Sequence, residues 1–381
     1  MDGETFQMIE FEGLEEWLSG IREELRSKTY KPKPVRRVMI PKPGGGERPL
    51  GIPTLKDRVV QTATKLVIEP IFEADLEPST YGYRPKKSAL GAVQKVHTLL
   101  REGYTDVVDA DLTKYFDTIP HNELMKCIAR RIVDRNVLHL IKQWLKSPVE
   151  ERDKKGRRRM SGGKKSTRGV PQGGVISPLL ANLYINRFLK YWRITERGKA
   201  FCAYVVSYAD DCVILSCGGA QQALEWTWKV MKQMGLTFNE EKTAIRDVQK
   251  EHFDFLGYTF GAMWFTRNGT RYMGATPSKA SIDRLKRKVR EQLSSSAKGK
   301  WPEVCKRLNA LLKGWSAYFS HGTTQPAFRA IERNVYERVR LFLVRRHKVR
   351  SRGINRFPSE KVFGKMGVFL PRPIRVSRCA P

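Results

Sequence analysis

The sequence lacks the features that mark membrane and secreted proteins. It has no run of about 18 apolar residues, the length that a membrane-spanning helix needs. Its first residues, Met1–Ile9, do not show the basic and then apolar order of a secretory signal. None of its six cysteines forms a C-x-x-C pair, so neither a zinc site nor a disulfide framework is expected. Cys212 and Cys217 are expected to be small buried residues of an apolar stretch. These absences predict a cytoplasmic protein with no membrane partner.

Acidic residues are scarce relative to basic ones. The 381 residues include 71 Lys and Arg but only 39 Asp and Glu, which leaves a net charge of +32. Such a charge indicates a polyanionic partner, with nucleic acid the first candidate and an anionic membrane surface the weaker one. The segment Ser278–Pro381 holds 26 basic and 6 acidic residues, and therefore +20 of that charge. This shift in composition predicts a domain boundary near Pro277.

Strand and helix signals alternate before that boundary. Val35–Pro41 and Glu47–Ile52 are expected to form a β-hairpin around Gly44-Gly45-Gly46. Thr54 is expected to cap a helix that reaches Phe72 and gathers apolar residues on one face. The residues of this face are Val59, Ala63, Leu66 and Val67.

The later elements are predicted from the same kinds of signal, which are apolar patterns and capping or turn residues. Tyr104–Leu112 predicts a buried strand, and Ser177-Pro178 predicts the N-cap and first turn of a helix that ends near Tyr191. The apolar runs Phe201–Ser207 and Cys212–Cys217 are separated by four residues, which indicates a tight β-hairpin. After Pro277 the apolar period becomes helical, so three amphipathic helices with basic outer faces are expected to form a small bundle. Their apolar stripes are Ile282, Leu285, Val289 and Leu293; Val304, Leu308, Leu311 and Trp315; and Phe328, Ile331, Val335, Val339 and Phe342.

Acidic residues gather at two of these elements. One group is V-D-A-D-L-T-K-Y-F-D, in which Asp111 ends the predicted strand, and the other is Tyr208-Ala209-Asp210-Asp211 in the predicted hairpin turn. Transfer of a nucleotidyl group by two metal ions needs such an arrangement, and Mg²⁺ prefers carboxylate oxygens. Each group alone has an ordinary explanation, because Asp-Asp is common in turns and Asp111 could cap the next segment.

A glycine-rich segment stands between the two acidic groups. It reads R-G-V-P-Q-G-G-V-I-S-P, from Arg168 to Pro178, and its paired glycines allow a close approach of the backbone to a nucleotide and template. Chance rarely produces three such elements in this order. The order therefore favours a catalytic site over three unrelated local features.

In this order, the three segments resemble motifs A, B and C of reverse transcriptases, and more narrowly the group II intron reverse transcriptase/maturase family. Supporting blocks are I-P-K-P-G-G-G-E-R-P-L-G-I-P (Ile40–Pro53), S-T-Y-G-Y-R-P (Ser79–Pro85), G-L-T-F-N-E-E-K-T (Gly235–Thr243) and F-D-F-L-G-Y-T-F (Phe253–Phe260). Leu308–Phe319 resembles the family's thumb, and Arg345–Phe369 its C-terminal end. The resemblance covers nearly the whole chain.

The resemblance implies roles for the matching positions. Asp111, Asp210 and Asp211 would be the catalytic carboxylates and the ligands of two Mg²⁺ ions, for which Mn²⁺ could substitute. Lys42 and Arg48 would reach the incoming triphosphate, or else belong to a solvated hairpin. The other implied contacts are Phe116 as the gate against a ribose 2′-hydroxyl, Gln172 and Gly173 along the nucleotide and template, and Phe255, Leu256 and Gly257 as the primer grip.

The resemblance also implies an α+β right-hand polymerase fold, with fingers and palm of antiparallel sheet plus helices and a helical thumb. Residues 1–277 would form fingers and palm, 278–345 the thumb/maturase domain, and 346–381 a basic C-terminal extension. The implied partners are an RNA template, a DNA primer, dNTPs and structured group II intron RNA.

The implied function is RNA-directed DNA synthesis combined with maturase activity that aids intron splicing and mobility. Two alternatives stay open: a splicing cofactor with a vestigial polymerase site, and a host-domesticated reverse transcriptase, for example beside a CRISPR integrase. No DNA endonuclease is expected, because no Cys pairs or His-Asn-His set follow the last bundle helix. The family usually begins upstream of a V-D-G sequence, matched here by Met1-Asp2-Gly3, so a truncated, late-started or naturally short chain stays open.

Overall fold

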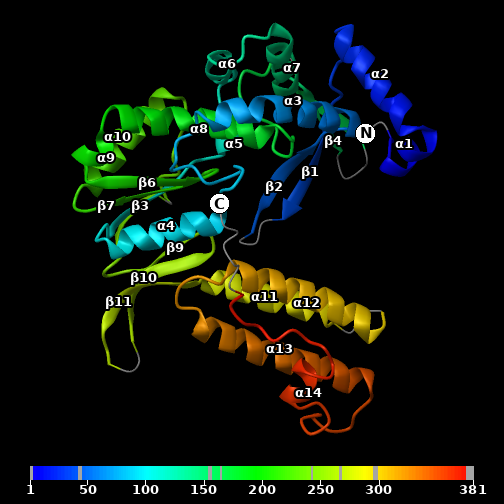
Figure 1. Cartoon of the computed structure of the whole chain (residues 1–381), viewed down its shortest axis with the longest axis vertical. Helices are drawn as coiled ribbons and strands as arrows, with labels where there is room; N and C mark the ends of the chain where they lie inside the picture. Colours follow the sequence, from blue (N-terminus) through cyan, green and yellow to red (C-terminus); the bar gives the residue numbers. More distant parts are fainter. Residues whose placement is uncertain are drawn as a thin grey trace. The chain divides into compact units, whose positions relative to one another are not determined.

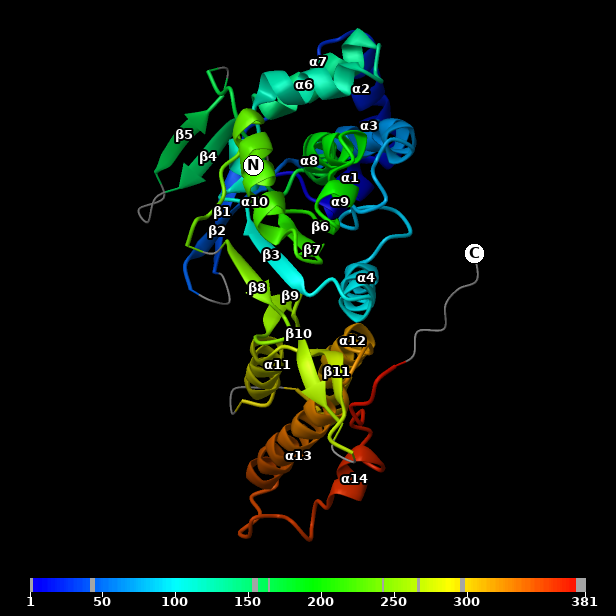
Figure 2. The same cartoon turned by 90° about the vertical axis from the view of Figure 1, so that its left-hand side faces the viewer.

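The computed structural model describes residues 3–41, 45–152, 157–163, 165–241, 243–265, 268–294 and 299–374. The chain divides into two compact units, each assembled from two stretches of sequence. The first unit consists of Met1–Ala89 and Asp106–Ile245, and the second of Leu90–Thr105 and Arg246–Pro381. Figures 1 and 2 follow the chain by colour through the elements of each unit.

The first sheet of the first unit contains the predicted hairpin. Its strand order is β2-β1-β4-β5, and β1 pairs antiparallel with β2 from Arg36↔Ile52 to Pro41↔Glu47. β4 runs parallel to β1, and β5 is antiparallel to β4. The hairpin is confirmed, while Gly44 in its connection lies outside the described residues. The bounds are α1 (Phe6–Glu12), α2 (Leu14–Arg26), β1 (Val35–Pro41), β2 (Glu47–Ile52), β4 (Pro148–Arg152) and β5 (Arg158–Gly162).

Helix α3 (Leu55–Glu73) begins as predicted, with the Thr54 hydroxyl accepting a hydrogen bond from the Asp57 amide. The expected apolar face was wrong, because Leu66 and Val67 are exposed. The buried face is instead Asp57, Val60, Gln61, Ile68 and Phe72. The polar side chains of this face form internal hydrogen bonds. The Asp57 carboxylate accepts from the Tyr30 hydroxyl at 2.6 Å, and Gln61 Oε1 accepts from the Val175 amide at 2.8 Å.

The second sheet of this unit joins strands that are distant in the sequence. Its order is β6-β7-β3-β8, with β3 antiparallel to β7 and β7 antiparallel to β6. The bounds are β3 (Asp106–Asp111), β6 (Ala203–Tyr208), β7 (Asp211–Ser216) and β8 (Ala244–Asp247), and the unit boundary falls within β8. The predicted buried strand and the predicted hairpin are confirmed, although two residues rather than four separate the hairpin strands.

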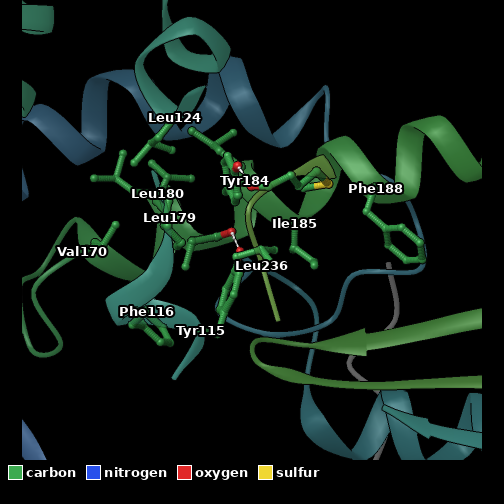
Figure 3. Close-up of a cluster of buried hydrophobic side chains, with 14 of the residues drawn as sticks. Tyr115, Phe116, Leu124, Val170, Leu179, Leu180, Tyr184, Ile185, Phe188 and Leu236 are labelled. Atoms are coloured by element: carbon green, nitrogen blue, oxygen red, sulfur yellow. Dashed lines mark hydrogen bonds between the residues drawn. The ribbon is translucent and has the colours of Figure 1, made fainter. Parts of the chain in front are cut away.

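Helices α8 and α10 lie on one side of this sheet (Figure 1). α8 is buried along most of its length, and its Leu179, Leu180, Tyr184 and Ile185 gather with side chains of neighbouring segments (Figure 3). Ser177 was wrongly expected to be the N-cap: it is the first helical residue, and its hydroxyl donates to the Pro171 carbonyl at 2.7 Å. The helices are α5 (Tyr115–Thr118), α6 (His121–Ala129), α7 (Arg135–Leu145), α8 (Ser177–Ile194), α9 (Arg197–Ala200) and α10 (Ala220–Gln233).

The second unit combines a small sheet with the predicted helical bundle. The sheet has the order β11-β10-β9, and α11, α12 and α13 run beside one another (Figure 1). The expected apolar stripes are confirmed as the bundle core, which contains Leu285, Leu308 and Val335, except that Phe328 is buried against Trp315 outside this cluster. The bounds are α4 (Ala89–Arg101), β9 (Phe253–Phe255), β10 (Tyr258–Trp264), β11 (Arg271–Pro277), α11 (Lys279–Gln292), α12 (Trp301–Tyr318), α13 (Gln325–Arg346) and α14 (Ser359–Phe363).

The cysteines of the described residues are all free thiols. Cys212 is buried as predicted, but Cys217 is exposed, because it follows the last residue of β7 and no longer belongs to the covered strand. In the part of the chain that the structure describes, no helix is both long and apolar enough to cross a membrane.

Candidate active site

Two of the three predicted catalytic carboxylates are paired residues of one sheet. The β3–β7 ladder runs from Asp106↔Ser216 to Asp111↔Asp211, so Asp111 and Asp211 are direct Cα partners at its end. Directly opposed residues of an antiparallel pair have Cβ atoms about 4.5–5.5 Å apart. The register of this ladder therefore brings together two carboxylates that are separated by about a hundred residues in the chain.

The third carboxylate stands in the turn that follows β6. Tyr208 and Asp211 are the last pair of the β6–β7 ladder, which leaves Ala209 and Asp210 as a two-residue turn. Ala209 has a φ of 57°, a left-handed conformation that is unfavourable for alanine. The turn places Asp210 in the chain directly before Asp211, beside the Asp111–Asp211 pair.

The carboxylates gathered at the β6–β7 hairpin affect the pKa of Asp211. Asp211 has an exposed surface, yet the protein atoms around its carboxyl group, followed by the negative charges of Asp210, Asp111 and Asp109, raise its pKa to about 6. Arg48 acts in the opposite direction and lowers that pKa. A divalent cation would relieve the repulsion, and carboxylate oxygens are the ligands that Mg²⁺ prefers.

Asp111, Asp210 and Asp211 are thus the residues that could hold a divalent metal. Among the described residues, no three His, Cys, Asp or Glu side chains form a ready-made ligand group. The metal assignment therefore rests on the strand register, the turn and the concentration of negative charge, and it stays a prediction.

Phe116 lies close to this site in the sequence but inside the core in the structure. Its side chain is only 5% exposed, and its ring meets that of Tyr115 edge-on, with 5.7 Å between centroids (Figure 3). Its carbonyl accepts a hydrogen bond from the Val170 amide at 2.7 Å, which ties the segment after Asp111 to the glycine-rich loop. A gate against a 2′-hydroxyl would use the small exposed part of the ring, and this role stays a prediction.

The glycine-rich loop packs on strand β2. The Gly51 amide donates to the Gln172 carbonyl at 2.5 Å, and Arg48 Nε donates to Gln172 Oε1 at 2.8 Å. Gly173 has a φ of 105°, and a Cβ there would collide with the Gly51 carbonyl. The structure thus brings together Arg48, Gln172 and Gly173 of the predicted nucleotide site, whereas Lys42 lies outside the described residues.

The predicted primer grip belongs to the second unit. Phe255 ends β9 and pairs with Tyr258, while Leu256 and Gly257, with φ of 49° and 80°, form the turn into β10. The Tyr318 hydroxyl donates to the Leu256 carbonyl at 2.7 Å, and the Ser281 hydroxyl donates to the Gly257 carbonyl at 3.0 Å. The turn is thereby held by α12 and α11, and its role at a primer stays a prediction.

Several residues that support the site were not predicted from the sequence. Gly82 lies against the Ala209–Asp210 turn, Asn182 donates to the Gly82 carbonyl, and Gln61 accepts from the glycine-rich loop at Val175. Gly82 lies in the block S-T-Y-G-Y-R-P, which was recognised in the sequence but given no role, and Asn182 follows the glycine-rich segment by four residues. Gln61 carried no signal, because a glutamine on an amphipathic helix is expected to face solvent.

Two family models match this chain. Residues 40–260 match the family described as reverse transcriptase (RNA-dependent DNA polymerase), which is more than half of the chain and includes all three carboxylates. The chain belongs to the reverse transcriptase family. Residues 282–357 match the maturase-specific domain of group II introns, so the protein has the domain pair of a group II intron reverse transcriptase/maturase. Its α+β fold is accordingly that of a right-hand polymerase.

Relatives of this family include proteins of different length. Protein YkfC of Escherichia coli (strain K12) is 43% identical over 62% of this chain and 69% of its own length. The group II intron-encoded protein LtrA of Lactococcus lactis subsp. cremoris is 36% identical over 46% of this chain, but the match spans only 28% of LtrA. A solved structure of apo telomerase from Candida Tropicalis is 13% identical and has a TM-score of 0.49, with 82% of this chain and 61% of that chain covered. The family assignment does not depend on the telomerase likeness.

Proposed function

We propose that this reverse transcriptase is an active RNA-directed DNA polymerase of the group II intron type. The observation that carries the proposal is the direct pairing of Asp111 with Asp211, with Asp210 in the adjoining turn. Polymerases of this family generally use divalent metals. We infer that the three carboxylates hold two Mg²⁺ ions, which Mn²⁺ could replace.

When bound, the ions would activate the primer 3′ oxygen and neutralise the charge of the triphosphate and leaving group. The carboxylates supply the negative charge that holds such ions in place. Arg48, with Lys42, would bind the triphosphate, while Gln172 and Gly173 would line the nucleotide and template. Phe116 would exclude the ribose 2′-hydroxyl, and Phe255, Leu256 and Gly257 would hold the primer end.

The proposed function also assigns a role to each part of the chain. Residues 1–277 would be fingers and palm, 278–345 the thumb/maturase domain, and 346–381 the basic extension. The +20 charge carried by Ser278–Pro381 suits the phosphates of an RNA template, a DNA primer and structured intron RNA. The match of residues 282–357 to a maturase-specific domain favours intron binding as a second function. A splicing cofactor with a vestigial polymerase site, or a host-domesticated enzyme, remains the alternative.

The test is extension of a DNA primer by dNTPs on an RNA template. Asp111→Asn and Asp210→Asn should each abolish extension and leave template–primer affinity nearly unchanged, because the carboxylates act on the transition state and not on the duplex. Asp106→Asn is the control, since Asp106 is an acidic residue at the other end of the same strand and pairs with Ser216. Extension by either variant at the rate of the control would contradict the assignment.

Binding separates the polymerase from the splicing cofactor. A cofactor with a vestigial site would bind folded group II intron RNA tightly but would not extend a primer even as the wild-type protein. A host-domesticated enzyme would extend the primer and bind intron RNA no better than an unrelated RNA of equal length. Intron-selective binding together with primer extension is the result that the proposal expects.

A further inference from the structure

The segment Ser79–Gly82 lies against the β6–β7 hairpin, which carries Asp210 and Asp211. The proposed reaction gives this segment no role. Thr80 and Ser207 form a parallel bridge at the free edge of β6. The Tyr81 amide donates to the Ser207 carbonyl at 2.8 Å, and the Ser207 amide donates to the Ser79 carbonyl at 3.0 Å. Ser207 is three residues before Asp210, so this segment extends the sheet up to the carboxylate turn.

Gly82 continues the segment and touches the turn itself. A Cβ at Gly82 would lie 2.5 Å from the Ala209 nitrogen and 3.1 Å from the Tyr208 carbonyl carbon. Both contacts are backbone atoms, which cannot move aside without moving the turn. Any side chain at Gly82 would therefore displace Ala209 and, with it, Asp210.

Asn182 of α8 holds Gly82 from the other side. Its side chain is 1% exposed, and its Nδ2 donates to the Gly82 carbonyl at 2.6 Å. The preceding residue, Ala181, accepts a hydrogen bond from the Tyr115 hydroxyl at 2.6 Å. Two consecutive residues of one buried helix thus hold the two carboxylate-bearing regions. Ala181 contacts Tyr115, four residues after Asp111, and Asn182 contacts Gly82, which in turn touches the Ala209–Asp210 turn.

The turn needs such support. Ala209 has a left-handed φ of 57°, which an alanine adopts only when its surroundings impose it. Contacts from outside the hairpin therefore have to hold Ala209 in this conformation.

We propose that Gly82 and Asn182 are positioning residues that set the place of the Ala209–Asp210 turn, and so the place of Asp210 relative to the Asp111–Asp211 pair. The inference rests on the proposed polymerase function and deepens it. Gly82 allows the backbone of its segment to reach the turn, and Asn182 keeps that segment in contact with it. Neither residue needs to touch a substrate.

The chain offers a matched control for each residue. Gly219→Ala introduces a methyl group against the Phe201 carbonyl at the opposite end of the β6–β7 hairpin, a backbone collision comparable to that of Gly82→Ala. Asn186, one turn after Asn182 on α8, is also buried, with Oδ1 accepting from the Glu77 amide at 2.9 Å and Nδ2 donating to the Asp75 carbonyl at 3.0 Å. Gly219→Ala and Asn186→Ala therefore reproduce the structural damage away from the turn.

The first experiment measures single-turnover incorporation of one dNTP on an RNA template, with Mg²⁺ titrated, together with the melting temperature. Gly82→Ala should slow incorporation by about 10- to 100-fold, and Asn182→Ala by about 10-fold, as expected when a supporting shell of metal ligands is disturbed. Both should also raise the Mg²⁺ concentration at half-maximal rate. The controls should lose a similar amount of thermal stability and keep the wild-type rate within about twofold.

A second measurement needs no turnover. Binding of Mn²⁺, followed through the EPR signal of the free ion, should be weaker in Gly82→Ala and Asn182→Ala than in their controls. If each variant matches its control in rate, Mg²⁺ requirement and Mn²⁺ binding, the two residues are only structural and the proposal is wrong. A wild-type protein that binds Mn²⁺ but extends no primer would contradict the polymerase function, and the Mn²⁺ comparison would still decide the positioning role.

Discussion

Asp111 and Asp211 stand directly opposite each other, as Cα partners at the end of the antiparallel β3–β7 ladder. Like charges at opposed positions destabilise a sheet. Burial by the surrounding protein, followed by the negative charges of Asp210, Asp111 and Asp109, raises the pKa of Asp211 to about 6. An arrangement that weakens the sheet at one point is typical of a functional site.

The first prediction is that Asp211→Asn stabilises the metal-free protein while it abolishes primer extension. Removing one of two opposed carboxylates should raise the free energy of unfolding by about 0.2–1 kcal/mol. Thermal unfolding in EDTA measures the gain, and added Mg²⁺ should raise the melting temperature of the wild type more than that of the variant. Asp106→Asn should instead destabilise slightly, because a neutral amide oxygen is a weaker acceptor than the carboxylate for the hydrogen bond of 2.9 Å from the Gly218 amide. Equal losses of stability in both variants would contradict the repulsion.

The second prediction concerns sugar selection. Phe116→Val should let the enzyme incorporate ribonucleotides, because a smaller side chain leaves room for the 2′-hydroxyl. Phe116 is also a core residue, so the variant should lose stability, by up to about 3 kcal/mol. Phe188→Val, in the same core cluster, is the control that should lose stability without a change in the ratio of ribonucleotide to deoxynucleotide incorporation. Unchanged selectivity in Phe116→Val would leave Phe116 as a core aromatic only.

The third prediction concerns the pair Arg48 and Gln172, which share a hydrogen bond of 2.8 Å. Arg48→Gln and Gln172→Ala should each raise the KM for dNTP and change primer affinity little. Because the two side chains contact each other, the double variant should lose less than the sum of the single losses, with a coupling of about 0.5–3 kcal/mol. Arg37→Gln is the control, since Arg37 lies on the partner strand β1 and pairs with Glu151. Additive effects would place Arg48 and Gln172 in independent roles.

The fourth prediction concerns the basic segment at the end of α13. Replacing the exposed Arg345, Lys348 and Arg350 by Gln should flatten the slope of log K against log salt by about 2 to 3, because fewer counterions are released from phosphates. Arg346 is left in place, since its Nη2 donates to the Gly299 carbonyl at 2.8 Å.

Two ligands distinguish the roles of this segment. If it binds structured intron RNA, affinity for folded intron should fall more than affinity for a simple primer–template, whereas a segment that follows the growing duplex should affect both alike. If the slopes for both ligands are unchanged, the basic segment is a solvent-exposed surface that does not contact nucleic acid. Asp210→Asn should leave the slopes nearly unchanged.

Much of the local structure was predictable, because its signals are local. The strands around Gly45 and Gly46 have the expected bounds, Thr54 caps α3 through its hydroxyl, and the three helical stripes form the second core. The buried face of α3 was not predictable in this way. Leu66 and Val67 were expected to be covered, yet hydrogen bonds of Asp57 to Tyr30 and of Gln61 to Val175 make a face with polar residues the buried one.

The sequence by itself determined the chemistry of this protein. It placed an aspartate at the end of one apolar strand and a pair in a hairpin turn, and it arranged them in an order that indicates a polymerase. Periodicity and turn residues act over a few positions, so these features could be recognised without coordinates. Only the tertiary structure decided that β3 pairs with β7 in the register that opposes Asp111 and Asp211. It also decided that Gly82 packs against the Ala209–Asp210 turn and that Asn182 binds Gly82. Strand register and close backbone contact depend on packing between segments that are about a hundred residues apart. A local sequence pattern does not indicate which distant segments pack together or in which register.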